Sequence, residues 1–381
     1  MKSNTRPWHG SRCAAIAATT ALSALAWPAT AQAETLAGDP VLDAPAETTI
    51  GDVVLTVGGG PTYIKPQVFA GADSLYGAVA AEGRGLDEPF RGKLKGEHLF
   101  LEAETETSLE FGGLDDVRLA FRANYSHGQG RQSGEIFRPQ DYYLLVMSVD
   151  PQWNFMGTVG NRNAAFIGSS ISMEMGNTDM SLGLDVRGES EHWEAGTTLT
   201  PLLHAGLFAS YQRYAVETKH WEVDNPTLYN ARLDESLDTF DLGPKLGAGL
   251  ELDLPGGASV SVRGDAAIVG TWAALSADQE VRSYGVSGNY RPPSGYAHKD
   301  LNTNFTSLLF QFALNAEAPL TESLSLGMAT SYRRWSARPT IMNPLEVTSN
   351  PTINPNINPG VKIGRAEAWE ANAALTLRYA F

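Results

Sequence analysis

Apolar and polar residues alternate along the end of the chain. Counting back from Phe381, every second residue as far as Trp369 is apolar, and aromatic residues stand at both ends of this set. The intervening residues are mostly small or polar. Because successive side chains of a strand point to opposite faces, this pattern predicts a strand with one apolar and one polar face.

The same alternation recurs in pairs of segments joined by short turns. Residues 240–254 and 260–272 flank Pro255-Gly256-Gly257, and two further pairs have the same layout: 99–111 with 117–125, and 306–316 with 324–332. Alternating segments joined by a few turn residues predict antiparallel hairpins.

Between the hairpins lie long segments rich in Gly, Pro, Asn and charge. They are residues 64–96, 127–140, 217–238, 274–300 and 336–364. Short turns at one end and long loops at the other are typical of outer-membrane barrels, whose short turns face the periplasm. A soluble sandwich, the competing interpretation, has less reason to separate loop lengths in this way.

We therefore predict an all-β fold: a single closed, antiparallel transmembrane β-barrel over residues 51–381. Asp179 to Arg187 and His192 to Thr200 are predicted strands, and Ile171 to Met175 is a candidate strand. The clearly alternating segments give 12 strands, and the runs near Tyr142 and Trp153 raise the count to 14. A last strand that pairs with the first leaves no open edge, so the chain can end inside the sheet. Gly58 to Gly60 are expected to let the first strand bend.

The beginning of the chain has the features of a secretory leader. Lys2, Arg6 and Arg12 precede an Ala-rich stretch from Ala14 to Ala26, and Ala31-Gln32-Ala33 is a small-residue cleavage pattern. This predicts a signal peptide over residues 1–33, cleaved after Ala33, and a periplasmic lead-in over residues 34–50. The apolar stretch is shorter than the roughly 20 residues of a spanning helix.

Composition narrows the function classes. The lone Cys13 lies in the leader, so a mature chain has no disulfide framework and no thiolate metal site. The leader carries three of the 28 basic residues and none of the 43 acidic ones, and the acidic remainder is unsuited to nucleic acid. We predict no metal and no cofactor.

Charged residues occupy the polar phase of the predicted strands. Glu102, Glu104 and Glu106 lie on one strand, and Arg118 and Arg122 lie on the next. Opposed rows of charge in a water-filled lumen would select ions, whereas simple cross-strand ion pairs would only stabilise the wall. Carboxylates two residues apart on a strand are about 7 Å apart, which is too far for one calcium ion. Further pore-lining candidates are Lys245, Glu251, Arg263, Asp265, Glu370 and Arg378.

Aromatic residues on the apolar phase cluster near the ends of the predicted strands. We interpret them as anchors at the membrane interface, the alternative being core packing in a soluble sandwich. They are Tyr125, Tyr211, Trp272, Tyr332, Trp369, Tyr379 and Phe381.

Catalytic patterns are weak. No Gly-x-Ser-x-Gly motif occurs, so we predict that the chain is not an enzyme. Two alternatives stay open. A barrel hydrolase would bring His and Asp, or Ser and His, together at one accessible rim. A structural or adhesive barrel would have its lumen filled by side chains or by a loop.

Residues 192–218 and 238–270 resemble the pore-forming major-outer-membrane-protein family of Gram-negative bacteria. The similarity includes the strand entry Gly243-Pro244-Lys245-Leu246-Gly247 and extends diffusely over residues 190–381. It implies a porin in the outer membrane for passive diffusion of small solutes or ions, and the acid-rich interior suggests a mild cation preference. The terminal Phe381 resembles the signal read by the barrel-assembly machinery. The family analogy also admits a homo-oligomer.

Overall fold

The structure is a computed structural model that describes residues 53–65, 94–107, 116–137, 143–146, 156–159, 164–193, 196–224, 227–285, 295–342, 346–348 and 361–381. The predicted leader (1–33), its cleavage site and the lead-in (34–50) lie outside the described residues. Among those described, no helix is long and apolar enough to cross a membrane.

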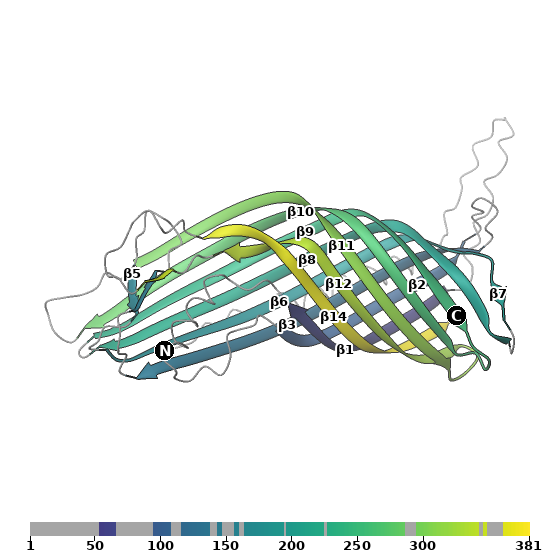
Figure 1. The fold of residues 1–381 in the computed structure, drawn as a ribbon, viewed down its shortest axis with the longest axis horizontal. Coiled ribbons are helices and arrows are strands. Elements are labelled where there is room, and N and C mark those ends of the chain that lie inside the picture. The colour runs from purple at the N-terminus through teal and green to yellow at the C-terminus, as the bar shows by residue number, and fades with distance from the viewer. Residues whose placement is uncertain are drawn as a thin grey trace, which may run out of the picture.

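Ten long strands close into an antiparallel barrel (Figure 1). Every neighbouring pair is antiparallel, and the pairing of β6 with β8 completes the ring that also includes β1 next to β14. The predicted all-β closed antiparallel barrel is confirmed. The ring strands are β1 (Val53–Lys65), β2 (Leu94–Glu106), β3 (Asp116–Phe137), β6 (Ala164–Arg187), β8 (Thr198–Asp224), β9 (Thr227–Asp253), β10 (Ser259–Gly285), β11 (Gly295–Pro319), β12 (Leu324–Met342) and β14 (Lys362–Ala380).

The last strand closes against the first. Leu55 pairs with Tyr379 across β1 and β14, and the backbone N–H of Phe381 donates to the Val53 carbonyl at 3.0 Å. The Gly58 to Gly60 segment lies inside β1, where a Cβ on Gly60 would come 2.1 Å from the Ala373 carbonyl oxygen. The glycine there allows close approach of the strands at the closing seam.

The closed sheet has fewer strands than the predicted 12 to 14. Ile171 to Met175 and Asp179 to Arg187 belong to one strand, β6, because the backbone between them stays paired with both neighbours. The run from His192 to Thr200 is interrupted by a turn with Gly196 at φ 79°, which leaves the two-residue β7 (Glu191–His192) beside β8. A separate three-stranded sheet contains β4 (Tyr143–Val146), β5 (Met156–Val159) and β13 (Glu346–Thr348).

The strands continue through much of what the sequence predicts as loop. β8 and β9 are 27 residues each and are separated by only two residues, so most of 217–238 is strand. β10 likewise runs on to Gly285, and β11 begins at Gly295, inside the predicted loop 274–300. β3 extends to Phe137 and β12 to Met342, so the loops predicted at 127–140 and 336–364 also begin too early.

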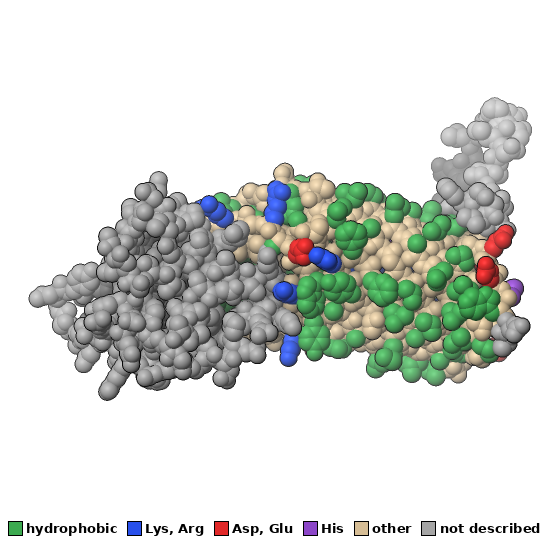
Figure 2. All heavy atoms as spheres, viewed as in Figure 1, with side chains coloured by type: hydrophobic (Ala, Val, Ile, Leu, Met, Phe, Trp, Pro, Cys, Tyr) green, Lys and Arg blue, Asp and Glu red, His purple; other side chains and the backbone are tan. Residues whose placement is uncertain are grey.

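The two parts of the barrel have opposite inside–outside patterns. In the lower part of β8, toward the short turns, Leu203 and Leu207 are exposed on the outer wall and His204 is buried inside. In the upper part, Tyr214 and Val216 are buried inside while Arg213 is exposed outside. Figure 2 shows the apolar band on the outer wall of the part toward the short turns, on the right in this view. We call this part the banded barrel and refer to it as lower. The part beyond the level of Tyr211, Phe240 and Trp272 is the extension, which we refer to as upper.

Candidate functional site

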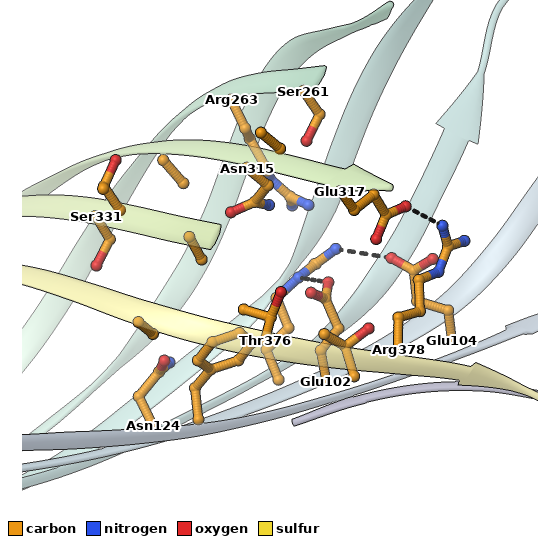
Figure 3. Close-up of a pocket in the computed structure, with 18 of the residues that line it drawn as sticks. Glu102, Glu104, Asn124, Ser261, Arg263, Asn315, Glu317, Ser331, Thr376 and Arg378 are labelled. Carbon is orange, nitrogen blue, oxygen red and sulfur yellow. Dashed lines mark hydrogen bonds and ion pairs between the residues drawn. The ribbon is translucent and has the colours of Figure 1, made fainter. Parts of the chain in front are cut away.

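The interior of the banded barrel contains a polar chamber near the short turns. It has a volume of about 190 Å³ and is lined by residues of all ten ring strands (Figure 3). Its lining mixes acids and bases, so it presents no single sign of charge. The charged lining residues are Glu102, Glu104, Arg118, Arg122, Asp185, Arg187, Glu251, Arg263, Asp265, Glu317 and Arg378.

Asp185 on β6 is the centre of the charged network. Its Oδ2 lies 2.5 Å from Arg122 Nη2 and 3.2 Å from Arg263 Nη1, and its Oδ1 contacts the buried His204 Nδ1. Sequence reasoning missed both Asp185 and His204, although each stands on the polar phase of its strand. The network joins β3, β6, β8 and β10 across the lumen.

The predicted rows of opposite charge face each other across β2 and β3. Arg122 contacts Glu102 through Nε and lies 3.3 Å from Glu104 through Nη2. Arg118 lies 3.1 Å from Glu106, but the Glu106 side chain is 58% exposed and does not line the chamber. The carboxylates are therefore engaged with arginines rather than left free for a passing ion.

The other predicted charges lie inside the barrel as well. Lys245 Nζ lies 2.8 Å from Asp265, and Arg263 Nε donates to Asp265 at 2.9 Å. Glu251 lies 2.9 Å from Arg187, and Arg378 contacts Glu317. Each of these predicted interior charges thus has a partner of opposite charge. Glu370 lies in a second layer of buried polar groups, which is described next.

A second layer of buried polar groups crosses the lumen above the chamber. Arg333 on β12 contacts Asp179 on β6, and their side chains are 1% and 4% exposed. In the ring, β6 and β12 stand opposite each other, separated by four strands on either side. Asn177 Nδ2 donates to Glu370 at 3.3 Å, a contact from β6 to β14. These contacts span the full width of the barrel.

Arg338 extends this layer toward β9. Its Nη2 lies 3.4 Å from Asp241, with both side chains buried, and its guanidinium stacks 4.0 Å from the Trp335 ring centroid. Phe208, Leu309 and Trp335 pack beside it in a buried apolar cluster. We call the residues Asp179, Asp241, Arg333, Arg338 and Glu370 the cross-lumen layer.

The interior of the extension is largely apolar, although the buried side chains of Glu235 and Gln279 also lie on the inward phase of β9 and β10. Buried side chains from most of the ring strands meet there, among them Leu94, Met173, Tyr214, Leu237 and Leu275. Each of these is at most 2% exposed. In the described part of the chain, buried side chains therefore occupy the lumen at two levels, the cross-lumen layer and the extension.

The predicted interface aromatics lie on the outward phase of their strands. Strand pairing puts Tyr125, Thr178, Tyr211, Phe240 and Trp272 in one row across five strands at the upper edge of the apolar band. On the other side of the barrel, the Tyr332 and Trp369 rings lie 6.2 Å apart between centroids. Tyr379 and Phe381 lie 4.6 Å apart at the short-turn end.

One histidine cluster lies on the outer wall of the extension. His298 on β11 is bound through Nδ1 to Asp278 at 2.8 Å and through Nε2 to Asp300 at 3.0 Å, and Tyr296 also contacts Asp278. The hydrogen bond to Asp278 and then that to Asp300 raise the pKa of His298. Both ring nitrogens of His298 are thus engaged by carboxylates in this structure.

Among the described residues, no group of three or more His, Cys, Asp or Glu is arranged to hold a metal ion.

No family model and no curated protein matches the chain. Similar solved structures include the outer membrane protease OmpT from Escherichia coli, at 10% identity and TM-score 0.36, covering 88% of this chain and 99% of that one. The transport unit of the autotransporter AIDA-I from Escherichia coli gives 8% identity and TM-score 0.25, with 90% and 93% covered. The anion-selective porin from Comamonas acidovorans is 10% identical with a TM-score of 0.20, and the match covers 88% of this chain and 100% of that one.

These similarities are too low to carry an argument about function. The resemblance to the major-outer-membrane-protein family, for which no family model matches, stays a prediction.

Proposed function

We propose that this chain is an outer-membrane β-barrel with a closed lumen, which acts through its outer surface and not as an open pore. The apolar outer band supports the membrane position. Leu203, Leu246, Ile268, Met328 and Leu375 are each more than half exposed there, an arrangement that suits lipid and not water. The row of aromatic side chains at the edge of the band suits a membrane interface.

The observation that carries the closed lumen is the contact of Arg333 with Asp179 between opposite strands. An open channel needs a continuous polar path wide enough for a hydrated solute. Here the cross-lumen layer occupies the banded barrel, and buried, mostly apolar side chains occupy the interior of the extension. The polar chamber below would then be a blind vestibule open toward the short turns.

The orientation follows the usual rule for such barrels. With the short turns in the periplasm, the extension projects outward from the cell. The apolar band of the 27-residue β9 ends at Phe240, so about half of this strand stands beyond the membrane. A rigid tube of this kind suits surface display or adhesion, in which the outer segments contact a partner.

The test is electrical. Purified, refolded protein that shows a heat-modifiable band is added to a planar lipid bilayer, and a known open porin is added in parallel as the control. We expect no steady current above the bare bilayer. Steady ohmic steps that scale with the protein would overturn the closed lumen and favour the passive channel that the sequence predicts. A salt gradient would then read its predicted cation preference.

Two further expectations belong to this proposal. The chain acts without catalysis, and the His298 cluster is where a rim hydrolase would be sought, since His298 and Asp278 meet on an accessible surface. A homo-oligomer stays a prediction, and the apparent mass of the refolded protein in detergent by light scattering is its measurement.

A further inference from the structure

Basic side chains gather on one side of the outer wall, directly above the apolar band. Strand pairing puts Lys65 on β1 and Arg334 on β12 on either side of Trp369 on β14. Arg365 is also on β14 and faces outward like Trp369. Lys95 on β2 pairs with Tyr63 on β1. Figure 2 shows Lys and Arg side chains collected along this edge of the band. We call Lys65, Lys95, Arg334 and Arg365 the basic edge.

The basic edge stands out against the charge of the molecule. The chain carries 43 acidic and 28 basic residues, yet among the residues that the structure describes here, four exposed cations stand with two outward acids, Glu97 and Glu367. On the opposite side of the extension, β8 and β9 interleave the two signs, as where Arg232 lies between Glu217 and Asp234. The excess positive charge is therefore local to one side and one height.

The contacts of these cations leave capacity for an anion. Arg334 binds Glu367 through a single nitrogen, Nη2, at 2.8 and 2.9 Å, and its side chain remains 53% exposed. Arg365 Cζ lies over the Phe305 ring at 4.3 Å from its centroid, a contact that does not neutralise the charge of the guanidinium. Adjacent strands are about 4.8 Å apart, so Lys65 and Arg334 flank Trp369 with their backbones about 10 Å apart.

We propose that the basic edge binds the phosphate groups of a glycolipid in the outer leaflet. This inference rests on the proposed membrane position and orientation. Cations directly above an interfacial aromatic meet the depth at which lipid headgroups carry their phosphates, while the apolar band below accommodates acyl chains. Arginine and lysine bind phosphate through charge-assisted hydrogen bonds. The ligand is thus a phosphorylated, acylated sugar rather than a free anion.

The test measures binding of purified lipopolysaccharide to the refolded full chain in detergent. The variant is K65Q/R334Q/R365Q, and the matched control is K219Q/R232Q, which removes exposed basic side chains from the outer wall of β8 and β9. Wild-type protein is also titrated with lipopolysaccharide whose lipid phosphates have been removed, and inorganic phosphate is added as a competitor. None of the changed residues is buried, and heat modifiability checks that each variant is folded.

We expect the triple variant to bind lipopolysaccharide about tenfold more weakly or worse, because it loses several charge-assisted contacts. The control variant should bind like the wild type, dephosphorylated lipid should bind as weakly as the triple variant binds intact lipid, and inorganic phosphate should not compete. Equal binding by triple variant and wild type, or no preference for the phosphorylated lipid, would overturn the proposal. Competition by inorganic phosphate would reduce the site to a free-anion site and overturn the lipid assignment. Bilayer current is independent of all these outcomes, so a failure here is distinct from a failure of the closed lumen.

Discussion

Asp179 is the residue whose removal tests the cross-lumen layer most directly. Replacing it with Asn keeps its shape but removes the nearest counter-charge of the buried Arg333 and leaves Glu370 as its other nearby anion, so we expect a cost of about 3 kcal/mol of unfolding free energy. Reversible urea unfolding in detergent micelles or lipid vesicles measures this free energy.

Two controls separate charge from packing in this experiment. The exposed pair Arg334–Glu367 is the matched surface case, so E367Q should cost no more than about 1 kcal/mol. The double variant R333M/D179L replaces the buried pair with apolar groups but deprives the buried Glu370 of the nearby Arg333 charge, so it should recover only part of the loss. A D179N protein as stable as E367Q would mean that water reaches the Arg333 guanidinium and that the layer is not dry.

His298 gives a residue-scale prediction about pH. Hydrogen bonds to Asp278 and Asp300 raise its pKa above the ordinary 6.5, so the protonated form is favoured in the folded protein. The associated stability is present below the pKa of the unfolded chain and is lost as pH rises through the folded value. NMR titration of the imidazole protons should give a pKa above 6.5, and D278N should lower it. A value at or below 6.5 with both carboxylates intact would contradict these contacts.

At the scale of the element, the sequence alone does not reveal that apolar side chains face outward in the banded barrel and inward in the extension of the same strand. In β8, Tyr211 is outward at the edge of the band; above it, outward positions carry Arg213 and Glu217 and inward ones Tyr214 and Val216. The alternation has the same period in both halves, but the medium outside changes from lipid to water. If apolar residues are assumed to face outward along the whole strand, the charged upper half of the strand is taken for a loop.

The lower halves of the strands were predictable for the same reason. Phe240, Leu242, Leu246 and Leu250 alternate with small or polar residues over a span that matches a bilayer, so the hairpins and the outward aromatics follow from period alone. The cross-strand pairing of Glu102 with Arg122 also follows from the register of one hairpin. Contacts between strands far apart in the ring, such as Arg333 with Asp179, depend on barrel closure, and no local pattern encodes them.

The extension provides a test at the element scale. Leu275 is 1% exposed inside it, and the adjacent Ala274 faces outward on the same strand, β10. L275D places an uncompensated carboxylate in an apolar cluster and should cost more than about 3 kcal/mol of unfolding free energy. A274D introduces the same group on the outer wall and should change stability by about 0.5 kcal/mol or less. Urea unfolding measures both, and equal tolerance of the two variants would mean that the extension is filled with water.

At the scale of the whole molecule, the protein is a tube whose net charge lies mainly on its outer surface. Its inner charges are matched to one another, as Lys245 with Asp265 and Arg187 with Glu251, so the net charge of −15 is expressed largely outside the lumen. An acidic composition therefore does not make an acid-lined channel. The predicted cation preference rests on counts of charged residues, and the paired charges inside the barrel do not support it.

The end of the chain carries the last prediction, which concerns assembly of the whole barrel. The Phe381 backbone N–H bonds to the Val53 carbonyl at 3.0 Å, whereas its side chain is 69% exposed and packs against Tyr379 alone among the ring contacts described. F381A keeps the backbone bond, so the refolded protein should lose no more than about 1 kcal/mol. If the barrel-assembly machinery reads this aromatic terminus, the same variant should fall several-fold in the outer membrane of cells. L320A, another exposed apolar residue at the short-turn end, is the matched control and should assemble normally. Quantifying heat-modifiable protein in outer-membrane fractions, beside urea unfolding of the refolded proteins, separates assembly from stability, and equal membrane levels for F381A and L320A would refute the role of Phe381.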